Sequence, residues 1–360
     1  VMLTRYPPGH SVFIALAIFS ARNLSIDKNF GIYAFIWGSY GLISMMIYLI
    51  GSQYWKGWRS IIPSLLWMTY IPALWSAKQP NSEIPFILFF LIGVCVLIRS
   101  INADNPKWLM FQIAGVIFGL SMLIRPIALP IGFLLFIYVL IFLKEELLTK
   151  KFAFAACFLF GAYLPALIWG LHVKNTTGQF VLLSTSGPNA IIDGLTFSTA
   201  NHDDHEDNNL IDKLSITQEF QKAITERKPG TTSELFSIII EKSLSNPVGI
   251  MQLLLIKAAR SWYALDSMRF ETYIIPYQLM YLTIIIFSIV ISMKHKYIPK
   301  NFAVLTAVLV FSFWGMTIAA LSILRYMLPV FPLLLIFAPS IFFILQVGKS
   351  RKVDKYQVLP

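Results

Sequence analysis

One carboxylate and three arginines stand at the edges of long apolar segments. Glu83 lies in AKQPNSEIP, and the arginines Arg5, Arg125 and Arg325 lie close to prolines in RYPPG, LIRPIALP and LRYMLPVFP. An arginine can bind a phosphate through two hydrogen bonds and stabilise the charge that develops as the phosphate leaves. A carboxylate can take a proton from an attacking hydroxyl. One candidate chemistry for these residues together is group transfer from a lipid-linked phosphate.

Each of these charges also has a purely structural explanation. Arginines at the ends of membrane helices often extend their guanidinium groups to the lipid head groups. Glu83 precedes an apolar run, where a carboxylate is favoured by the dipole of the helix that follows. The functional interpretation therefore depends on whether the charges converge on one face, because a cluster at a bilayer boundary is costly without a role.

The composition identifies the kind of chain that must position these residues. Hydrophobic residues make up 57% and charged residues 13%, and the mean hydropathy is +0.68. Soluble domains contain about 25% charged residues, so this chain is predicted to be a membrane protein. Cys95 and Cys157 both lie in apolar runs, so no disulfide framework is expected. The net charge of +11 fits cytoplasmic loops of a membrane protein and gives no reason to expect nucleic-acid binding.

Nine apolar runs are interpreted as membrane spans, since a span needs roughly 20 mainly apolar residues. The predicted fold class is all-α: a polytopic transmembrane helical bundle of about nine spans plus a short N-terminal interfacial helix, with one large extracytoplasmic, partly helical loop. The expected spans are 29–51, 61–77, 84–99, 108–124, 127–143, 152–172, 276–293, 301–322 and 328–347.

Three regions follow from this pattern. Residues 1–172 form an N-terminal membrane region with the interfacial helix and six spans, and residues 173–275 form an extracytoplasmic loop domain. Residues 276–360 form a C-terminal membrane region with three spans and a basic cytoplasmic tail. Within the loop, 210–263 has apolar residues at helical spacing.

The distribution of basic residues predicts the orientation. With the long loop outside, fourteen lysines and arginines fall on the inner connections and tail, and six fall on the short outer segments. Lysine and arginine collect on the cytoplasmic side of membrane proteins. We therefore expect a multi-pass protein of the cytoplasmic (inner) membrane, with the long loop extracytoplasmic and the C-terminus cytoplasmic.

The first twenty residues contain an apolar run, Val12 to Phe19, that is too short to cross a bilayer. Two prolines and a glycine precede it, which favours a bend that begins a helix. Residues 1–28 lie outside in the predicted orientation, so this run is expected to form an interfacial helix.

Four stretches resemble a known family. They are RYPPGHSVFIAL, GLSMLIRPIALP, TGQFVLLSTSGPNAIIDG and LRYMLPVFPLLLIFA, and they occur in the family's order. The chain resembles the C-type membrane glycosyltransferases related to protein O-mannosyltransferases and to the lipid A aminoarabinose transferase. This resemblance implies transfer of a sugar from a polyprenyl-phosphate donor, with inversion, to an acceptor on the outer face of the membrane.

The resemblance also implies roles for individual residues. Arg5 corresponds to a cationic residue against the donor phosphate, and Glu83 corresponds to an acidic catalytic residue near the acceptor. Outer-end arginines of the family line the same cavity. The predicted substrate-binding residues are Arg5, Tyr6, Arg125, Arg325 and Tyr326.

The family carries its principal acidic catalytic residue in an outer loop before the proline corner. Here that corner follows Val1 almost directly, so the base is expected to be missing upstream of Val1. On this expectation the chain is the larger part of a glycosyltransferase, and a truncated chain would be inactive.

The expected partners are a polyprenyl-phosphate-linked sugar donor, a glycan, lipid or protein acceptor, and membrane lipids. No cofactor is assigned, although a divalent metal is an open alternative because NHDDHEDNN at 201–209 contains metal-ligating residues. That run lacks a scaffold spacing such as HExxH, so a solvated loop is the favoured interpretation and no metal ligand is assigned. An O-antigen polymerase or ligase using lipid-linked glycans, and a polytopic transporter or flippase, remain alternative functions.

Overall fold

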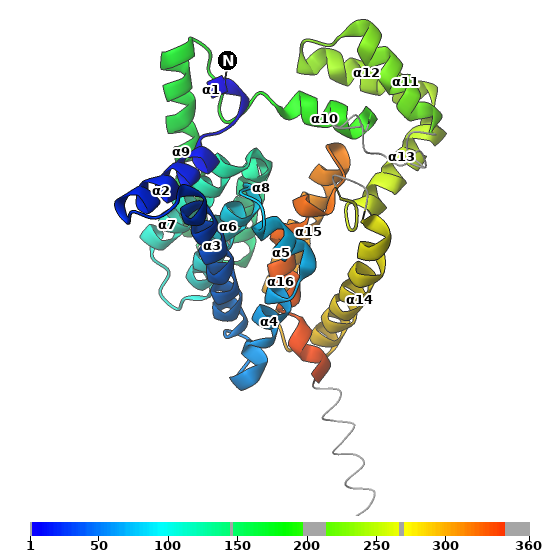
Figure 1. Ribbon diagram of the computed structural model, residues 1–360. Coiled ribbons are helices and arrows are strands. Elements are labelled where there is room, and N and C mark those ends of the chain that lie inside the picture. Colours follow the sequence, from blue (N-terminus) through cyan, green and yellow to red (C-terminus); the bar gives the residue numbers. More distant parts are fainter. Residues whose placement is uncertain (1, 145–146, 197–213, 266–269, 343–360) are drawn as a thin grey trace, which may run out of the picture.

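The computed structural model describes residues 2–144, 147–196, 214–265 and 270–342, and within these ranges the chain forms helices and no strand (Figure 1). Most of the helices form one bundle. A smaller group, from α10 (Gly187–Thr196) to α13 (Pro247–Arg260), lies beyond one end of it, on the same side as α1 (Met2–Arg5) (Figure 1). The short helix α4 lies toward the other end. The predicted all-α class is confirmed for the described residues.

Five helices are long and apolar enough to cross a membrane. The most buried of them is α6, which packs against α3 and α7 at the centre of the bundle. The five are α3 (Lys28–Gly51), α6 (Glu83–Asn102), α9 (Leu148–Thr177), α14 (Glu271–His295) and α15 (Lys300–Ala319). The expected number of nine membrane spans in the whole chain stays a prediction.

Shorter apolar helices complete the bundle. They are α7 (Trp108–Ile124), the 3-10 turn η2 (Pro126–Ala128) with α8 (Leu129–Phe142), and the segment that contains η5 (Leu328–Val330), α16 (Phe331–Leu335) and η6 (Ala338–Ser340). Helices α7 and α9 pack closely against each other. A methyl group at Gly115 or Gly119 of α7 would collide with the backbone of α9, so small residues bring these two helices together.

The span expected at 61–77 is wrong as a single helix. The structure has η1 (Gly57–Ser60) followed by two seven-residue helices, α4 (Ile62–Met68) and α5 (Ile71–Ala77). Pro72 explains the break, because inside a continuous helix its ring would clash with the carbonyl four residues earlier and one hydrogen bond would be lost. The chain instead turns at Tyr70, which has an extended conformation, and Pro72 lies in the first turn of the second helix.

The last expected span, 328–347, is also interrupted. Prolines occur at the beginning of η5, α16 and η6, so the segment is a series of short turns in place of one regular helix. Its side chains are nevertheless among the most buried of the bundle. Residues 343–347 lie outside the described residues.

The N-terminal proline corner forms as expected. Helix α1 (Met2–Arg5) is followed by α2 (Gly9–Asn23), which begins directly after Pro8. A Cβ atom at Gly9 would lie 2.6 Å from the backbone carbonyl of Leu123, so only glycine allows this close approach to the end of α7. Helix α2 exposes Val12, Leu16 and Phe19 and is not one of the five long apolar helices.

The group of helices outside the bundle has its own small apolar core. It contains α10 (Gly187–Thr196), α11 (Ser215–Arg227), α12 (Thr232–Ser245) and α13 (Pro247–Arg260), with Phe220 and Leu253 fully buried between them. The helical character predicted for 210–263 is confirmed from 215 onward. Lys257 of α13 is buried and donates a hydrogen bond of 2.8 Å to the Gly194 carbonyl of α10.

Candidate functional site

Glu83 is the first residue of α6 and lies at the end of the bundle nearest to α10–α13. Its side chain is almost completely buried, with 4% of the residue exposed. The carboxylate oxygen Oε1 lies 2.6 Å from Nη1 of Arg125 and 3.5 Å from Nε of Arg325. The other oxygen, Oε2, has no hydrogen-bond partner among the described residues. One buried carboxylate therefore pairs with two guanidinium groups.

Arg125 is placed by the end of α7. It is the residue after the last turn of that helix, and its backbone N–H still donates to the Ser121 carbonyl at 2.9 Å. Pro126 follows, and a residue before proline is restricted to an extended conformation, which Arg125 adopts. The helix must therefore end here, and the side chain leaves it toward the start of α6.

Arg325 comes from a segment far from both residues in the sequence, 200 positions after Arg125 and 242 after Glu83. It lies in the 3-10 turn η4 (Leu324–Tyr326) after α15. The turn is fixed by a hydrogen bond of 2.8 Å from the Leu324 N–H to the Ala264 carbonyl, just beyond α13. Through this bond the segment that follows α13 helps to position Arg325.

The ring of Tyr326 lies close to both arginines. The guanidinium carbon of Arg125 is 4.8 Å from the ring centroid, and that of Arg325 is 5.3 Å from it. Arginine binds favourably over an aromatic face at such distances. Tyr326 therefore holds two like charges close together, which Glu83 alone would compensate only in part.

His10 joins this neighbourhood, and sequence reasoning did not identify it. Its Nε2 lies 3.1 Å from the Pro80 carbonyl. Burial lowers the pKa of His10 below its ordinary value, and the hydrogen bond to Pro80 and the charge of Glu83 oppose this effect only partly. A sequence signal existed, because His10 directly follows the glycine of RYPPGH that packs against the end of α7.

Arg5 and Tyr6 are not part of the cluster around Glu83. Within the described part of the chain, the Arg5 side chain has one recorded contact, with its guanidinium carbon 5.5 Å from the Tyr6 ring centroid. Arg5 and Tyr6 are exposed, and the backbone of α1 binds the segment before α10 through the bond from Thr185 N–H to the Thr4 carbonyl at 2.9 Å. The predicted phosphate contact of Arg5 stays a prediction.

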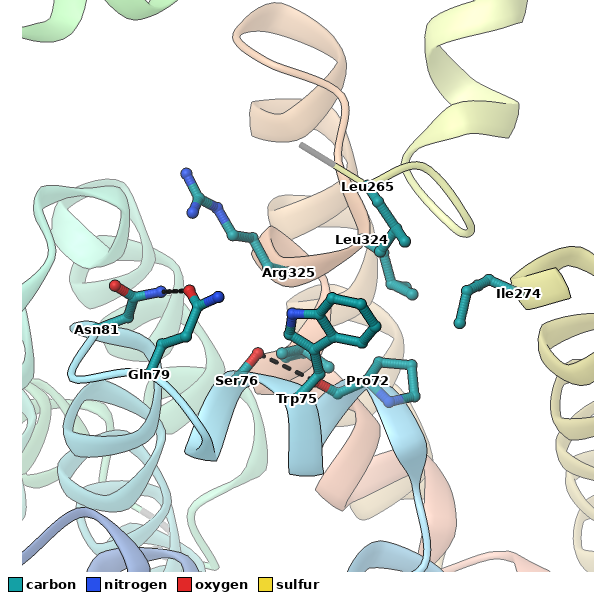
Figure 2. Close-up of a pocket in the computed structure, with 10 residues that line it drawn as sticks. Pro72, Trp75, Ser76, Gln79, Asn81, Leu265, Ile274, Leu324 and Arg325 are labelled. Carbon is teal, nitrogen blue, oxygen red and sulfur yellow. Dashed lines mark hydrogen bonds between the residues drawn. The ribbon is translucent and has the colours of Figure 1, made fainter. Parts of the chain in front are cut away.

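A cavity of about 200 Å³ lies beside the cluster, with Arg325 in its wall. Figure 2 shows that its two sides differ: Gln79, Asn81 and Arg325 lie on one side of Trp75, and Leu265, Leu324 and Ile274 lie on the other. Gln79 and Asn81 are joined by a hydrogen bond of 2.8 Å. A ligand with a polar head and an apolar body fits such walls. Sequence reasoning had not assigned Gln79 or Asn81 to a site.

The cluster also has a charge excess. Arg125, Arg325 and Glu83 together carry one net positive charge, and Arg325 is about one-third exposed next to the cavity. A positive group at the boundary between a polar and an apolar wall is suited to an anion on an apolar chain.

A metal centre is not found among the described residues, where no group of three or more histidine, cysteine, aspartate or glutamate side chains is close enough to hold an ion. The run at 201–209 lies outside those residues. The divalent-metal alternative is therefore untested.

The apolar helices and the buried charge cluster at one end of the bundle define the class: a multi-pass membrane protein with a polar site at the ends of its helices. Residues 6–169 match the family model of the dolichyl-phosphate-mannose-protein mannosyltransferases, which supports the family predicted from the sequence and points to a membrane glycosyltransferase. The match includes Tyr6, Glu83 and Arg125 and ends before Arg325. No curated protein and no solved structure matched the chain.

Proposed function

We propose that this chain binds a polyprenyl-phosphate-linked sugar at the Glu83 end of the bundle and transfers the sugar to an acceptor hydroxyl on the outer face of the cytoplasmic membrane, with inversion. One observation carries the proposal: two arginines share a single buried carboxylate beside a cavity that has one polar and one apolar wall. The family match supports a sugar linked to a lipid phosphate as the donor class.

In this mechanism the donor phosphate binds Arg325, and its first isoprenoid units lie along the apolar wall formed by Leu265, Ile274 and Leu324. The acceptor oxygen attacks the anomeric carbon, and the bond from that carbon to the phosphate oxygen breaks. The polyprenyl phosphate leaves with the electron pair of the broken bond, and Arg325 stabilises the additional negative charge. The proton of the acceptor hydroxyl passes to a carboxylate.

Glu83 has two functions in this proposal. Its Oε1 orients the two guanidinium groups through the contacts of 2.6 and 3.5 Å. Its Oε2 has no partner among the described residues and can accept a hydrogen bond from the acceptor hydroxyl. Arg125 is less exposed than Arg325, so it is assigned to positioning Glu83 and Tyr326.

The family match favours this transferase over the two alternatives. An O-antigen polymerase or ligase requires its essential residues in the long loop, whereas the matched residues end at 169, before that loop begins. A transporter requires charged groups along a path through the bilayer. In the described ranges, Glu83 and its arginine partners lie at helix ends instead.

The test uses the full chain, purified and reconstituted in liposomes with radiolabelled polyprenyl-phosphate mannose and with other polyprenyl-phosphate sugars. Release of polyprenyl phosphate and sugar transfer are measured together. We expect Arg325→Gln to lower turnover about 100-fold, the typical effect of removing one donor that stabilises a developing charge. Arg22→Gln, an exposed arginine in the last turn of α2, is the control and should leave turnover unchanged. Turnover by Arg325→Gln at the unaltered rate would disprove the phosphate role.

A further inference from the structure

A second polar cavity lies at the end of the bundle opposite to Glu83. Helix α6 begins at Glu83 and ends at Asn102, so the two ends are about 30 Å apart at 1.5 Å per residue. Asn102 lines an open cavity of about 660 Å³ together with residues that follow α3 and α8 and precede α15. The cavity is lined by Gln53, Tyr54, Asn102, Phe142, Lys144, Tyr297, Pro299, Lys300 and Asn301.

Two lysine side chains line this cavity. Lys144 follows α8 and Lys300 is the first residue of α15, and both are exposed. Within the described ranges neither ammonium group forms an ion pair. Lys300 also stands at the positive end of its own helix, where a cation is unfavourable. A helix start and two lysines together make this cavity attractive to an anion.

Neutral polar groups complete the lining. The Asn301 amide donates to Oδ1 of Asn102 at 3.2 Å, which holds the ends of α15 and α6 together. The hydroxyl of Tyr54 is buried and has no hydrogen-bond partner among the described residues. A buried hydroxyl without a partner is unfavourable, and an anion that reaches it would supply the missing acceptor.

We infer that this cavity binds the phosphate-bearing head group of an anionic membrane lipid, in the leaflet opposite to the Glu83 site. The shared chemistry is a phosphate held by two ammonium groups and a hydroxyl. A lipid is the source favoured here, because the cavity opens at the ends of helices long and apolar enough to span a bilayer, where head groups lie. The inference is independent of the proposed sugar transfer.

A neighbouring surface provides a matched control. Lys107 and Lys150 line another open cavity of about 500 Å³ at the same end of the bundle. The other residues that line it are apolar: Pro106, Trp108, Leu109, Ala153 and Phe154. The two sites thus have equal numbers of lysines, but only the first has amide and hydroxyl groups.

The test measures lipid binding to the purified full chain by native mass spectrometry, with phosphatidylglycerol and with phosphatidylcholine of the same acyl chains. We expect phosphatidylglycerol to bind more tightly, and the double variant Lys144→Gln/Lys300→Gln to weaken its binding about tenfold. Lys107→Gln/Lys150→Gln should weaken it less than twofold. Tyr54→Phe, which keeps the charge, should weaken it a few-fold through the lost hydrogen bond.

Three results would overturn the inference. Equal losses in the two double variants would mean that the lysines attract lipid only as general surface charge. Equal binding of phosphatidylcholine and phosphatidylglycerol would exclude an anion site. Displacement of the lipid by inorganic phosphate at the same concentration would show that a free phosphate, and not a lipid head group, is the ligand.

Discussion

The two ends of α6 use positive charge in opposite ways. At the Glu83 end, Arg125 is largely buried and is held by a carboxylate at 2.6 Å and an aromatic ring at 4.8 Å. At the Asn102 end, Lys144 and Lys300 are exposed and have no ion-pair partner within the described part of the chain. Arginines with fixed positions suit a site that must orient a reacting phosphate. Flexible lysines suit a site that only has to bind a head group.

The largest effect on stability and activity should come from removing the carboxylate of Glu83, which pairs with the arginines at its end of α6. Glu83→Gln leaves two guanidinium groups beside each other without their shared partner, and breaking a buried pair costs about 3–5 kcal/mol. We expect a clear fall in thermal stability in detergent and a loss of sugar transfer of at least about 100-fold.

The double variant Glu83→Gln/Arg125→Gln distinguishes an ion pair from a packing effect. If the pair is the cause, the second substitution removes one uncompensated charge, and the double variant should be more stable than Glu83→Gln alone. A loss of stability in the double variant equal to the sum of the losses in Glu83→Gln and Arg125→Gln would contradict the coupling between these residues.

Lys257, near the Glu83 end of the bundle, is buried, in contrast to the exposed Lys144 and Lys300. Burial lowers the pKa of Lys257 to about 7. Between pH 7 and about 10.5, the usual value for lysine, the unfolded chain therefore binds more protons at this position than the native chain. The free energy of unfolding should rise with pH across this window, by an amount on the order of a few kcal/mol, and level off above it.

The measurement is chemical unfolding of the purified protein from pH 6.5 to 9.5, compared with Lys257→Met. Methionine does not titrate, so the variant should show a flatter dependence on pH, although it also loses the hydrogen bond to Gly194. Parallel curves for the two proteins would refute a titrating Lys257.

A smaller effect is expected at the corner that brings α2 to the charged cluster. Gly9→Ala places a methyl group against the Leu123 carbonyl and should destabilise the fold by about 1–3 kcal/mol. Gly38→Ala is the control, since nothing lies within 4 Å of the added atom and alanine is a better helix former. Thermal unfolding of both variants measures the difference, and equal midpoints would show that the close approach is not required.

The sequence predicted the class and a cluster of Glu83 with three arginines, because charges beside prolines at the ends of apolar runs are visible in a single chain. Two of those arginines, Arg125 and Arg325, do lie beside Glu83. The sequence did not predict that Arg5 lies apart from Glu83 or that His10 lies near it, since both depend on how α1 and α2 pack against distant segments. The break at Tyr70 could have been read from Pro72. Hydropathy alone does not show this break, because residues on both sides of it are apolar, so 61–77 was predicted as one span.

The smallest and most selective change concerns the Tyr326 ring that both arginines contact. Tyr326→Leu removes the aromatic face at 4.8 and 5.3 Å from the two guanidinium carbons, whereas Tyr326→Phe keeps a face and removes only the hydroxyl. A cation over a partly exposed ring contributes about 0.5–1 kcal/mol. We therefore expect Tyr326→Leu to lower kcat/KM for the lipid-linked donor about three- to fivefold, and Tyr326→Phe to change it less than twofold. An equal loss in both variants would assign the effect to the hydroxyl, and no loss in either would mean that the ring is not needed to hold the arginines in place.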